Sequence, residues 1–204
     1  SLTVDCDLSV SNGATLILNG DSQINGNLTL ASGNLAGSGS LTVNGLLDWT
    51  GGTMSGAGTT TVGSGGALVI SGATNKYLEG PRVLTNRSAA GSSWSGTGYI
   101  DAQSVTGATF NNAGYLEIQN AQNMYDGTFN NSGVLTKTSA GTSAFNAESG
   151  AFNNSGTVNV LAGTLDVRRG GIDSGTFNMA SGGVVSLTDG TDEFTAGGSV
   201  TGAG

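Results

Sequence analysis

Histidine is absent from this chain of 204 residues, and cysteine and proline occur only once each. The absence of histidine excludes histidine-based acid–base catalysis and histidine metal ligation. Cys6 cannot form a disulfide within the chain, and its neighbours Asp5 and Asp7 disfavour a reactive thiolate. We therefore interpret Cys6 as a small strand residue, and we expect no cofactor.

Charge is also scarce, since 10% of the residues are charged, against about 25% in typical globular chains. The six basic residues are scattered, and the net charge is −8. No basic patch is present to neutralise phosphates, so nucleic acid and anionic membranes are not expected as partners. The chain also lacks a run of about 18 apolar residues and an apolar pattern of helical period, so we expect no membrane insertion and no helix.

Glycine is abundant instead, with 37 residues, and a short motif recurs. Phe-Asn-Asn-Ala-Gly at 110–114 returns as Phe-Asn-Asn-Ser-Gly at 129–133 and at 152–156, and a shortened copy stands at 175–178. The successive phenylalanines are 19, 23 and 25 residues apart. A repeat of this length indicates a solenoid, in which each coil buries its apolar face only against its neighbours.

In a solenoid of parallel strands, equivalent residues of successive coils lie above one another at about 4.8 Å. We expect the phenylalanines to form an inward column, and the asparagines to lie at turns and to bond to one another in a ladder. The glycine that follows each pair is expected to supply a positive φ. The residues of this predicted structural ladder are Phe110, Asn111, Asn112, Phe129, Asn130, Asn131, Phe152, Asn153, Asn154, Phe177 and Asn178.

Three stretches follow one another within one predicted domain, residues 1–204. Residues 1–72 carry apolar pairs at i and i+2, such as Leu28 and Leu30, separated by Asn-Gly dipeptides that mark turns. Asn-Gly also suits antiparallel hairpins, but the later repeat has the length of a coil, so we rank hairpins second. Residues 73–104 are interpreted as less regular coils with an insertion or a wider turn, and residues 105–204 contain the clear repeats.

The segment Leu78–Gly204 resembles the Gly/Ser/Asn-rich repeats of very large bacterial surface and secreted proteins. The resemblance rests on Phe-Asn-Asn-Ser-Gly-Thr-Val-Asn-Val at 152–160, Gly-Thr-Leu at 163–165 and Gly-Ser-Val-Thr-Gly-Ala-Gly at 198–204. Filamentous haemagglutinin-like proteins and autotransporter passengers are similar in style. The resemblance implies a protein outside the cell or on its surface. The predicted fold is all-β, a right-handed parallel β-helix of roughly nine coils of about 20–25 residues.

No polar capping helix is evident at either end of the predicted solenoid. Open ends expose unpaired strand edges, which favour association, and solenoids ordinarily need capping repeats. We therefore expect the chain either to continue into further repeats or to associate with itself end to end. The predicted function is structural, as a rod, a fibre subunit or an adhesin stalk segment.

Glycan binding and ice binding are alternatives with a partial basis in the sequence. A carbohydrate-binding module would present aromatic rings on one face, and the candidate rings belong to Trp49, Trp94, Tyr99, Tyr115 and Tyr125. Burial is the default for such rings, so we rank this function second. An ice-binding face would need a flat Thr-x-Thr array, and the Thr-x-Thr pairs of this chain do not recur in every coil.

The acidic residues suggest two further possibilities. A polysaccharide lyase or hydrolase needs convergent carboxylates, whereas Asp101, Glu117, Asp126 and Glu148 are spread over successive coils. We therefore expect that the protein is not an enzyme. The dense acidic cluster is the candidate for Ca²⁺ ligation, although it matches neither an EF-hand nor a Gly-Gly-x-Gly-x-Asp repeat, and we favour a solvated turn. Its members are Asp189, Asp192 and Glu193.

Overall fold

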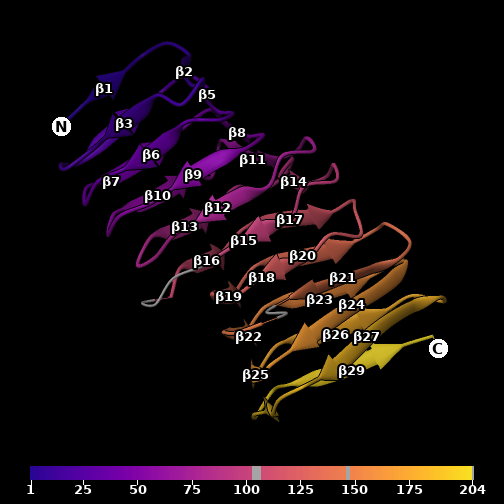
Figure 1. The fold of residues 1–204 in the computed structure, drawn as a ribbon. Helices are drawn as coiled ribbons and strands as arrows, with labels where there is room; N and C mark the ends of the chain where they lie inside the picture. The colour runs from indigo at the N-terminus through magenta and orange to yellow at the C-terminus, as the bar shows by residue number, and fades with distance from the viewer. Residues whose placement is uncertain (103–106, 146–147, 204) are drawn as a thin grey trace.

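The computed structural model describes residues 1–102, 107–145 and 148–203. These residues form 29 short strands and no helix (Figure 1). All strands are paired in parallel, each with strands three places away along the chain, in three long sheets. The predicted all-β parallel solenoid is confirmed, with about nine turns.

Each complete coil contributes one strand to each of three sheets, which we call A, B and C, and the last, partial coil contributes strands to sheets A and B. Sheet A contains β1 (Thr3–Val4), β4 (Ser22–Ile24), β7 (Ser40–Val43), β10 (Thr59–Val62), β13 (Val83–Asn86), β16 (Thr109–Asn112), β19 (Thr128–Asn131), β22 (Ala151–Asn154), β25 (Gly171–Asp173) and β28 (Asp192–Phe194). Sheet B contains β2 (Leu8–Val10), β5 (Leu28–Leu30), β8 (Leu46–Trp49), β11 (Ala67–Ile70), β14 (Ser93–Trp94), β17 (Tyr115–Ile118), β20 (Val134–Lys137), β23 (Thr157–Val160), β26 (Thr176–Met179) and β29 (Ser199–Gly202). Sheet C contains β3 (Thr15–Ile17), β6 (Asn34–Ala36), β9 (Gly52–Met54), β12 (Lys76–Leu78), β15 (Ile100–Asp101), β18 (Met124–Tyr125), β21 (Thr142–Phe145), β24 (Gly163–Arg168) and β27 (Gly183–Thr188).

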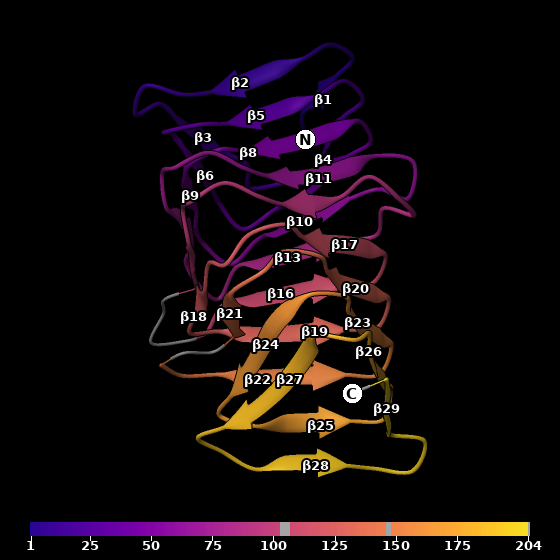
Figure 2. The ribbon, with the colours of Figure 1, turned by 90° about the vertical axis from the view of Figure 1, so that its right-hand side faces the viewer.

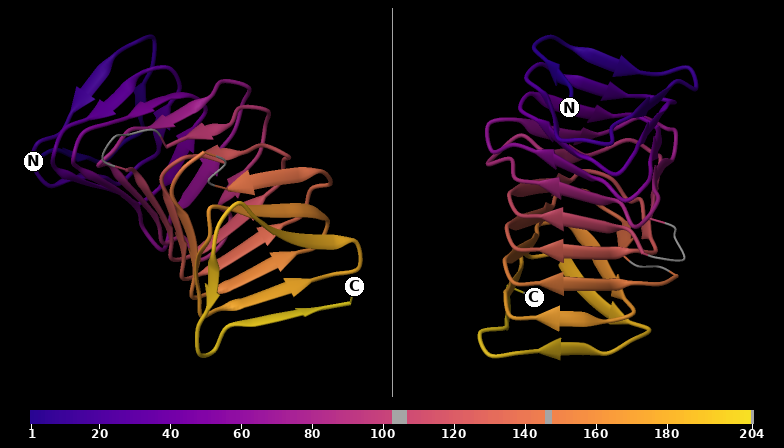
Figure 3. Two further views of the ribbon diagram at one scale, coloured as in Figure 1. Left: turned by 60° about the horizontal axis from the view of Figure 1, so that its bottom comes forward. Right: turned by 90° about the vertical axis from the view of Figure 1, so that its left-hand side faces the viewer.

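The coils are stacked directly on one another, so the hydrogen bonds of every sheet run from one coil to the next (Figure 2). The two termini lie at opposite ends of the stack (Figure 3). The antiparallel hairpins that Asn-Gly permitted do not occur in the described residues, where all pairings are parallel. Asn44-Gly45 shows why: it forms the corner between β7 and β8, where Gly45 packs against the carbonyl of Gly26 in the coil before.

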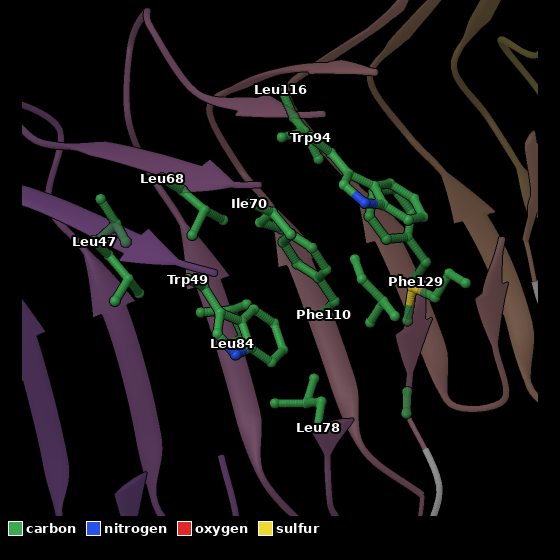
Figure 4. Packing of buried hydrophobic residues seen from close by; sticks show 14 of the residues in the cluster. Leu47, Trp49, Leu68, Ile70, Leu78, Leu84, Trp94, Phe110, Leu116 and Phe129 are labelled. Carbon is green, nitrogen blue, oxygen red and sulfur yellow. The ribbon is translucent and has the colours of Figure 1, made fainter. Parts of the chain in front are cut away.

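The hydrophobic core is a column enclosed by the three sheets (Figure 4). Alternate residues of most strands point into it, so β8 buries Leu47 and Trp49, and β11 buries Leu68 and Ile70 in register with them. Full burial of one such side chain stabilises the fold by roughly 1.5–3 kcal/mol relative to an exposed position. The column therefore holds each coil to the next along the whole stack.

Three of the four predicted phenylalanines form one column. Phe110, Phe129 and Phe152 are buried and lie in register in sheet A, with ring centroids 5.2 and 5.4 Å apart. Phe177 lies elsewhere: it belongs to β26 of sheet B, where it is in register with Val158. Its ring faces Phe152 from a different wall of the core, with the centroids 6.5 Å apart.

The residues before Phe177 explain its placement. Gly175-Thr176 occupies the position of Gly156-Thr157, which begins a strand of sheet B and not of sheet A. Asn178 accordingly donates to Oδ1 of Asn159, at 3.0 Å. The prediction that Phe177 and Asn178 continue the column and ladder of the other three copies was therefore wrong.

The asparagines of the repeat lie within strands rather than in turns, and the second asparagine of each copy ends its strand. Asn112, Asn131 and Asn154 are the last residues of β16, β19 and β22, and their side chains are buried. With Asn86 they form what we call the inner ladder, in which each Nδ2 donates to the next Oδ1 at 3.0, 2.8 and 2.9 Å. The strand end suits them because the same amide also reaches sheet B of the next coil, as in the bond from Asn112 to the carbonyl of Val134, the first residue of β20, at 3.0 Å.

A second ladder runs along the outside of sheet A. Asn111, Asn130 and Asn153 are half-buried and are linked by amide-to-oxygen bonds of 2.8 Å each. We call it the outer ladder. The two asparagines of each repeat therefore face opposite sides of the sheet, as successive strand residues must.

The glycine that ends each copy does not have the positive φ that we expected. Gly114, Gly133 and Gly156 all lie outside the left-handed region. They are required for a different reason, because a Cβ at Gly133 would lie 2.0 Å from the Gly114 carbonyl oxygen, and one at Gly156 would lie 2.2 Å from that of Gly133. At this corner the stacked backbones approach too closely for a side chain.

The coils around residues 73–104 are longer than those that follow. Asn86 bonds to Asn112, which is 26 residues later, whereas Asn112 bonds to Asn131, only 19 residues later. Part of the extra length lies between β13 and β14, at residues 87–92. The coil therefore absorbs additional residues at a corner while its strands stay in register.

Candidate functional site

Inward-facing side chains lose their cover at both ends of the stack. At the C-terminal end, the inward residues of the last coil are Leu187, Phe194 and Val200, with exposed fractions of 43, 40 and 56%. Their register partners one coil earlier are Val167, Asp173 and Phe177, which are fully buried or nearly so. At the N-terminal end, the half-buried residues are Leu2, Val4, Leu8 and Leu16. We call these two sets the C-terminal and N-terminal end surfaces.

The candidate calcium ligands do not converge. Asp192 and Glu193 are consecutive residues of β28, so their side chains point to opposite faces of the sheet. Asp189 lies in the preceding turn, with φ of 57°. Within residues 1–102, 107–145 and 148–203, no three acidic or cysteine side chains are grouped so that they would hold a metal ion. The acidic cluster is therefore spread around the last coil.

A cleft on the outside of sheet C gathers two of the candidate aromatic rings. It has a volume of about 270 Å³ and is lined by Tyr99, Asp101, Tyr125, Asp126 and Glu148, which we call the tyrosine cleft. The rings of Tyr99 and Tyr125 meet nearly at a right angle, at 80°, with centroids 5.2 Å apart. Three carboxylates that the sequence spreads over successive coils therefore lie around one hollow.

Register and turn geometry position this cleft. Asp101 of β15 is in register with Tyr77 of β12 on one side and with Tyr125 of β18 on the other. Asp126 has a positive φ of 56°, and its Oδ1 accepts a hydrogen bond of 2.6 Å from Ser149. Partial burial raises the pKa of Tyr99, as do Tyr77, which is hydrogen-bonded to it, and the charge of Asp101.

The other candidate aromatic and acidic residues lie away from the cleft. Trp49 and Trp94 are buried in the core, and Tyr115 is half-buried in sheet B. Glu117 also belongs to sheet B, where it accepts a hydrogen bond of 2.8 Å from the Thr138 hydroxyl. Of the five aromatic rings proposed for a sugar-binding surface, Tyr99 and Tyr125 are therefore the two that lie together in the cleft.

Sequence reasoning missed three buried cations. Lys76, Arg82 and Lys137 are each at most 1% exposed. Burial lowers the pKa of all three groups, that of Arg82 to about 10. Neutral oxygens replace a counter-ion at Lys137, whose Nζ donates to Ser139, Ser143 and the Asn120 carbonyl at 2.9–3.2 Å. The alternation Val-Leu-Thr-Lys at 134–137 carried the signal, since it places Lys137 at an inward position.

A buried carboxyl continues the line of the inner ladder. Asp173 is fully buried in β25 and is in register with Asn154. Burial raises the pKa of Asp173 to about 6, assisted by the nearby charge of Asp192. Within the part of the chain that the structure describes, Nδ2 of Asn154 has no hydrogen-bond partner. The inner ladder therefore ends at Asp173, a position where an asparagine side chain could accept a hydrogen bond from Asn154 and extend the ladder by one step.

Asp173→Asn is expected to raise the free energy of unfolding at about pH 8 by about 2–3 kcal/mol. The folded protein keeps the proton of Asp173 up to a pH of about 6, whereas an unfolded chain releases it near 3.8. The stability that protonated Asp173 contributes is therefore complete below about pH 4 and is lost as the pH rises to about 6. Urea unfolding over this range should show a decline in stability that is absent from the variant. A decline of equal size in the variant would assign it to other groups, and Asp7→Asn, at an exposed site, serves as the matched control.

Comparison of the chain with protein-family models, curated proteins and solved structures finds no match. The described residues also include no helix long and apolar enough to cross a membrane.

Proposed function

We propose that this chain is a segment of an extracellular structural rod, as a fibre subunit or adhesin stalk, that extends by stacking coil on coil at its ends. The observation that carries the proposal is the pair of uncovered end surfaces on a column that is otherwise closed. A further coil would bury these residues and would pair the open edges of three sheets. The location outside the cell rests on the resemblance of the Phe-Asn-Asn-Ser-Gly repeats to bacterial surface proteins.

The covering coil that we commit to is that of a second copy. Both end surfaces are rich in aliphatic residues, and both present one open edge from each of sheets A, B and C. The C-terminal end surface of one copy would thus continue into the N-terminal end surface of the next. Each copy would add about 45 Å to the rod, at about 4.8 Å for each of nine turns.

Charge limits how strongly the ends attract each other. Asp5 and Asp7 are exposed beside the N-terminal end surface, and Asp189 and Glu193 are exposed beside the C-terminal one. Stacking brings these like charges together, so salt, which screens exposed charges over about 10 Å at 0.1 M, should strengthen the association.

Val200→Lys is expected to weaken this self-association at least about tenfold, because it places a charge in the middle of the proposed contact. The matched control is Ile172→Lys, since Ile172 is equally exposed, at 56%, but lies on the side of the stack. Sedimentation over a range of protein and salt concentrations measures the association. Electron microscopy should show filaments whose axial repeat is about 45 Å, the length of one folded copy. A monodisperse rod at every concentration, or equal weakening by both variants, would contradict stacking through the ends.

A further inference from the structure

The four tyrosines of this chain are placed differently from its other aromatic residues. Both tryptophans and five of the six phenylalanines are buried, and Phe194 is exposed only at the uncovered end. All four tyrosines are half-buried on the outside of the solenoid, and Tyr99 and Tyr125 form a contacting pair, with ring centroids 5.2 Å apart. Neither ring is needed to fill the column, so packing of the core does not account for them.

The two rings form a corner that is held in place before any ligand arrives. The hydroxyl of Tyr125 accepts a hydrogen bond of 3.1 Å from Asn123 Nδ2, and Tyr99 is hydrogen-bonded to Tyr77. Asp126 is fixed by Ser149 at 2.6 Å. Because these side chains are already ordered, binding at the cleft would require little further loss of conformational entropy.

The charged groups that line the tyrosine cleft are all carboxylates. Asp101, Asp126 and Glu148 contribute carboxylates, and no basic side chain is among the described residues that line it. Arg168, which interacts electrostatically with Tyr125, is paired with Asp166, with Nε 2.7 Å from Oδ2. Such a cleft attracts hydroxyl and ammonium groups and repels carboxylates and phosphates.

We propose that the tyrosine cleft binds a non-anionic sugar unit of a glycan, neutral or carrying an amino group. A sugar ring has an apolar C–H face that can pack on a tyrosine ring, and its hydroxyls can donate to the carboxylates around it. The volume of about 270 Å³ is slightly below the usual range for drug-sized ligands, which suits one or two sugar units. The proposal is independent of stacking at the ends, because the cleft lies on the side of the solenoid.

Calorimetric titration of the full chain with three oligosaccharides tests this assignment. The probes are oligomers of glucosamine, of N-acetylglucosamine and of galacturonic acid, which are cationic, neutral and anionic. We expect binding of the first two with dissociation constants on the order of 0.1–1 mM, as for a small open site, and no binding of the third. Failure of both glucosamine and N-acetylglucosamine oligomers to bind, or equal binding of the galacturonic acid oligomer, would overturn the proposal.

Two variants and a matched control locate the site. Tyr125→Ala should weaken binding of both sugars at least about tenfold, whereas Tyr115→Ala, a half-buried tyrosine on sheet B, should leave it unchanged. Asp126→Asn, which keeps a residue that tolerates positive φ, should weaken the cationic probe several-fold more than the neutral one. Thermal unfolding of each variant reports whether it is folded. Equal loss in Tyr115→Ala and Tyr125→Ala variants that are both folded would refute the site.

Discussion

Asn131→Ala is expected to lower the free energy of unfolding by about 3–4 kcal/mol, from three lost hydrogen bonds and a small cavity. The side chain is 1% exposed and sits in the middle of the inner ladder. Its Nδ2 donates to Oδ1 of Asn154 at 2.9 Å and to the Thr157 carbonyl at 3.1 Å, and its Oδ1 accepts from Asn112 at 2.8 Å. Alanine would leave these buried partners without their bonds, and water cannot reach them to compensate.

The adjacent residue provides the control. Asn130 bonds to Asn111 and Asn153 at 2.8 Å each, but it is half-buried in the outer ladder, so water can replace those bonds. Asn130→Ala should therefore lower stability by less than about 1 kcal/mol. Urea unfolding of both variants at one pH measures the difference. If the two substitutions lower stability equally, burial does not determine how much the inner ladder contributes to stability.

Gly133→Ala should destabilise the solenoid by at least about 3 kcal/mol, since the new methyl group has no room. Its Cβ would lie 2.0 Å from the Gly114 carbonyl oxygen, and that oxygen belongs to the backbone of the preceding coil. To remove this clash the two coils must move apart. That movement would strain the backbone hydrogen bonds between β16 and β19 in sheet A and between β17 and β20 in sheet B, which flank this corner. The φ of Gly133 lies outside the left-handed region, so close approach alone accounts for the loss.

Gly65→Ala is the matched substitution. Gly65 also lies outside the left-handed region, and a Cβ there would meet no atom within 4 Å. We expect a change within about 0.5 kcal/mol, and any change to favour the folded state, because alanine restricts the unfolded chain. Thermal unfolding of the two variants side by side measures the effect. A melting temperature for Gly133→Ala equal to that of the unsubstituted protein would show that the backbone at this corner can move enough to accommodate a methyl group.

The architecture was predictable from the sequence because a solenoid repeats the same short strand-and-turn pattern in each coil. The spacing of Phe110, Phe129 and Phe152 predicted both the coil length and the direction in which these side chains point. What it could not predict was the sheet to which Phe177 belongs. Gly-Thr precedes a strand of sheet A at Thr128 and a strand of sheet B at Thr176, so the local residues are the same on two walls.

The tyrosine cleft was less accessible to sequence reasoning, because its residues come from successive coils of different length. Coils of 19 to 26 residues place Asp101, Asp126 and Glu148 around one hollow without any fixed spacing in the sequence. The buried cations escaped notice for a related reason. A lysine such as Lys137 is ordinarily exposed, so its place in the alternation was not read as burial, and its register with Ile118 and Val160 establishes the inward side chain.

The direction of the inter-coil hydrogen bonds has a mechanical consequence. These bonds lie along the axis of the stack, so a pull on the two ends opens them one coil at a time and does not shear a whole sheet at once. A coil of 19 residues occupies about 4.8 Å of axis when folded and releases roughly 65 Å of chain when it detaches. Because each coil contacts only its neighbours, the remaining coils keep their structure. Under load the molecule would act as a tether that lengthens in steps and limits the force it transmits.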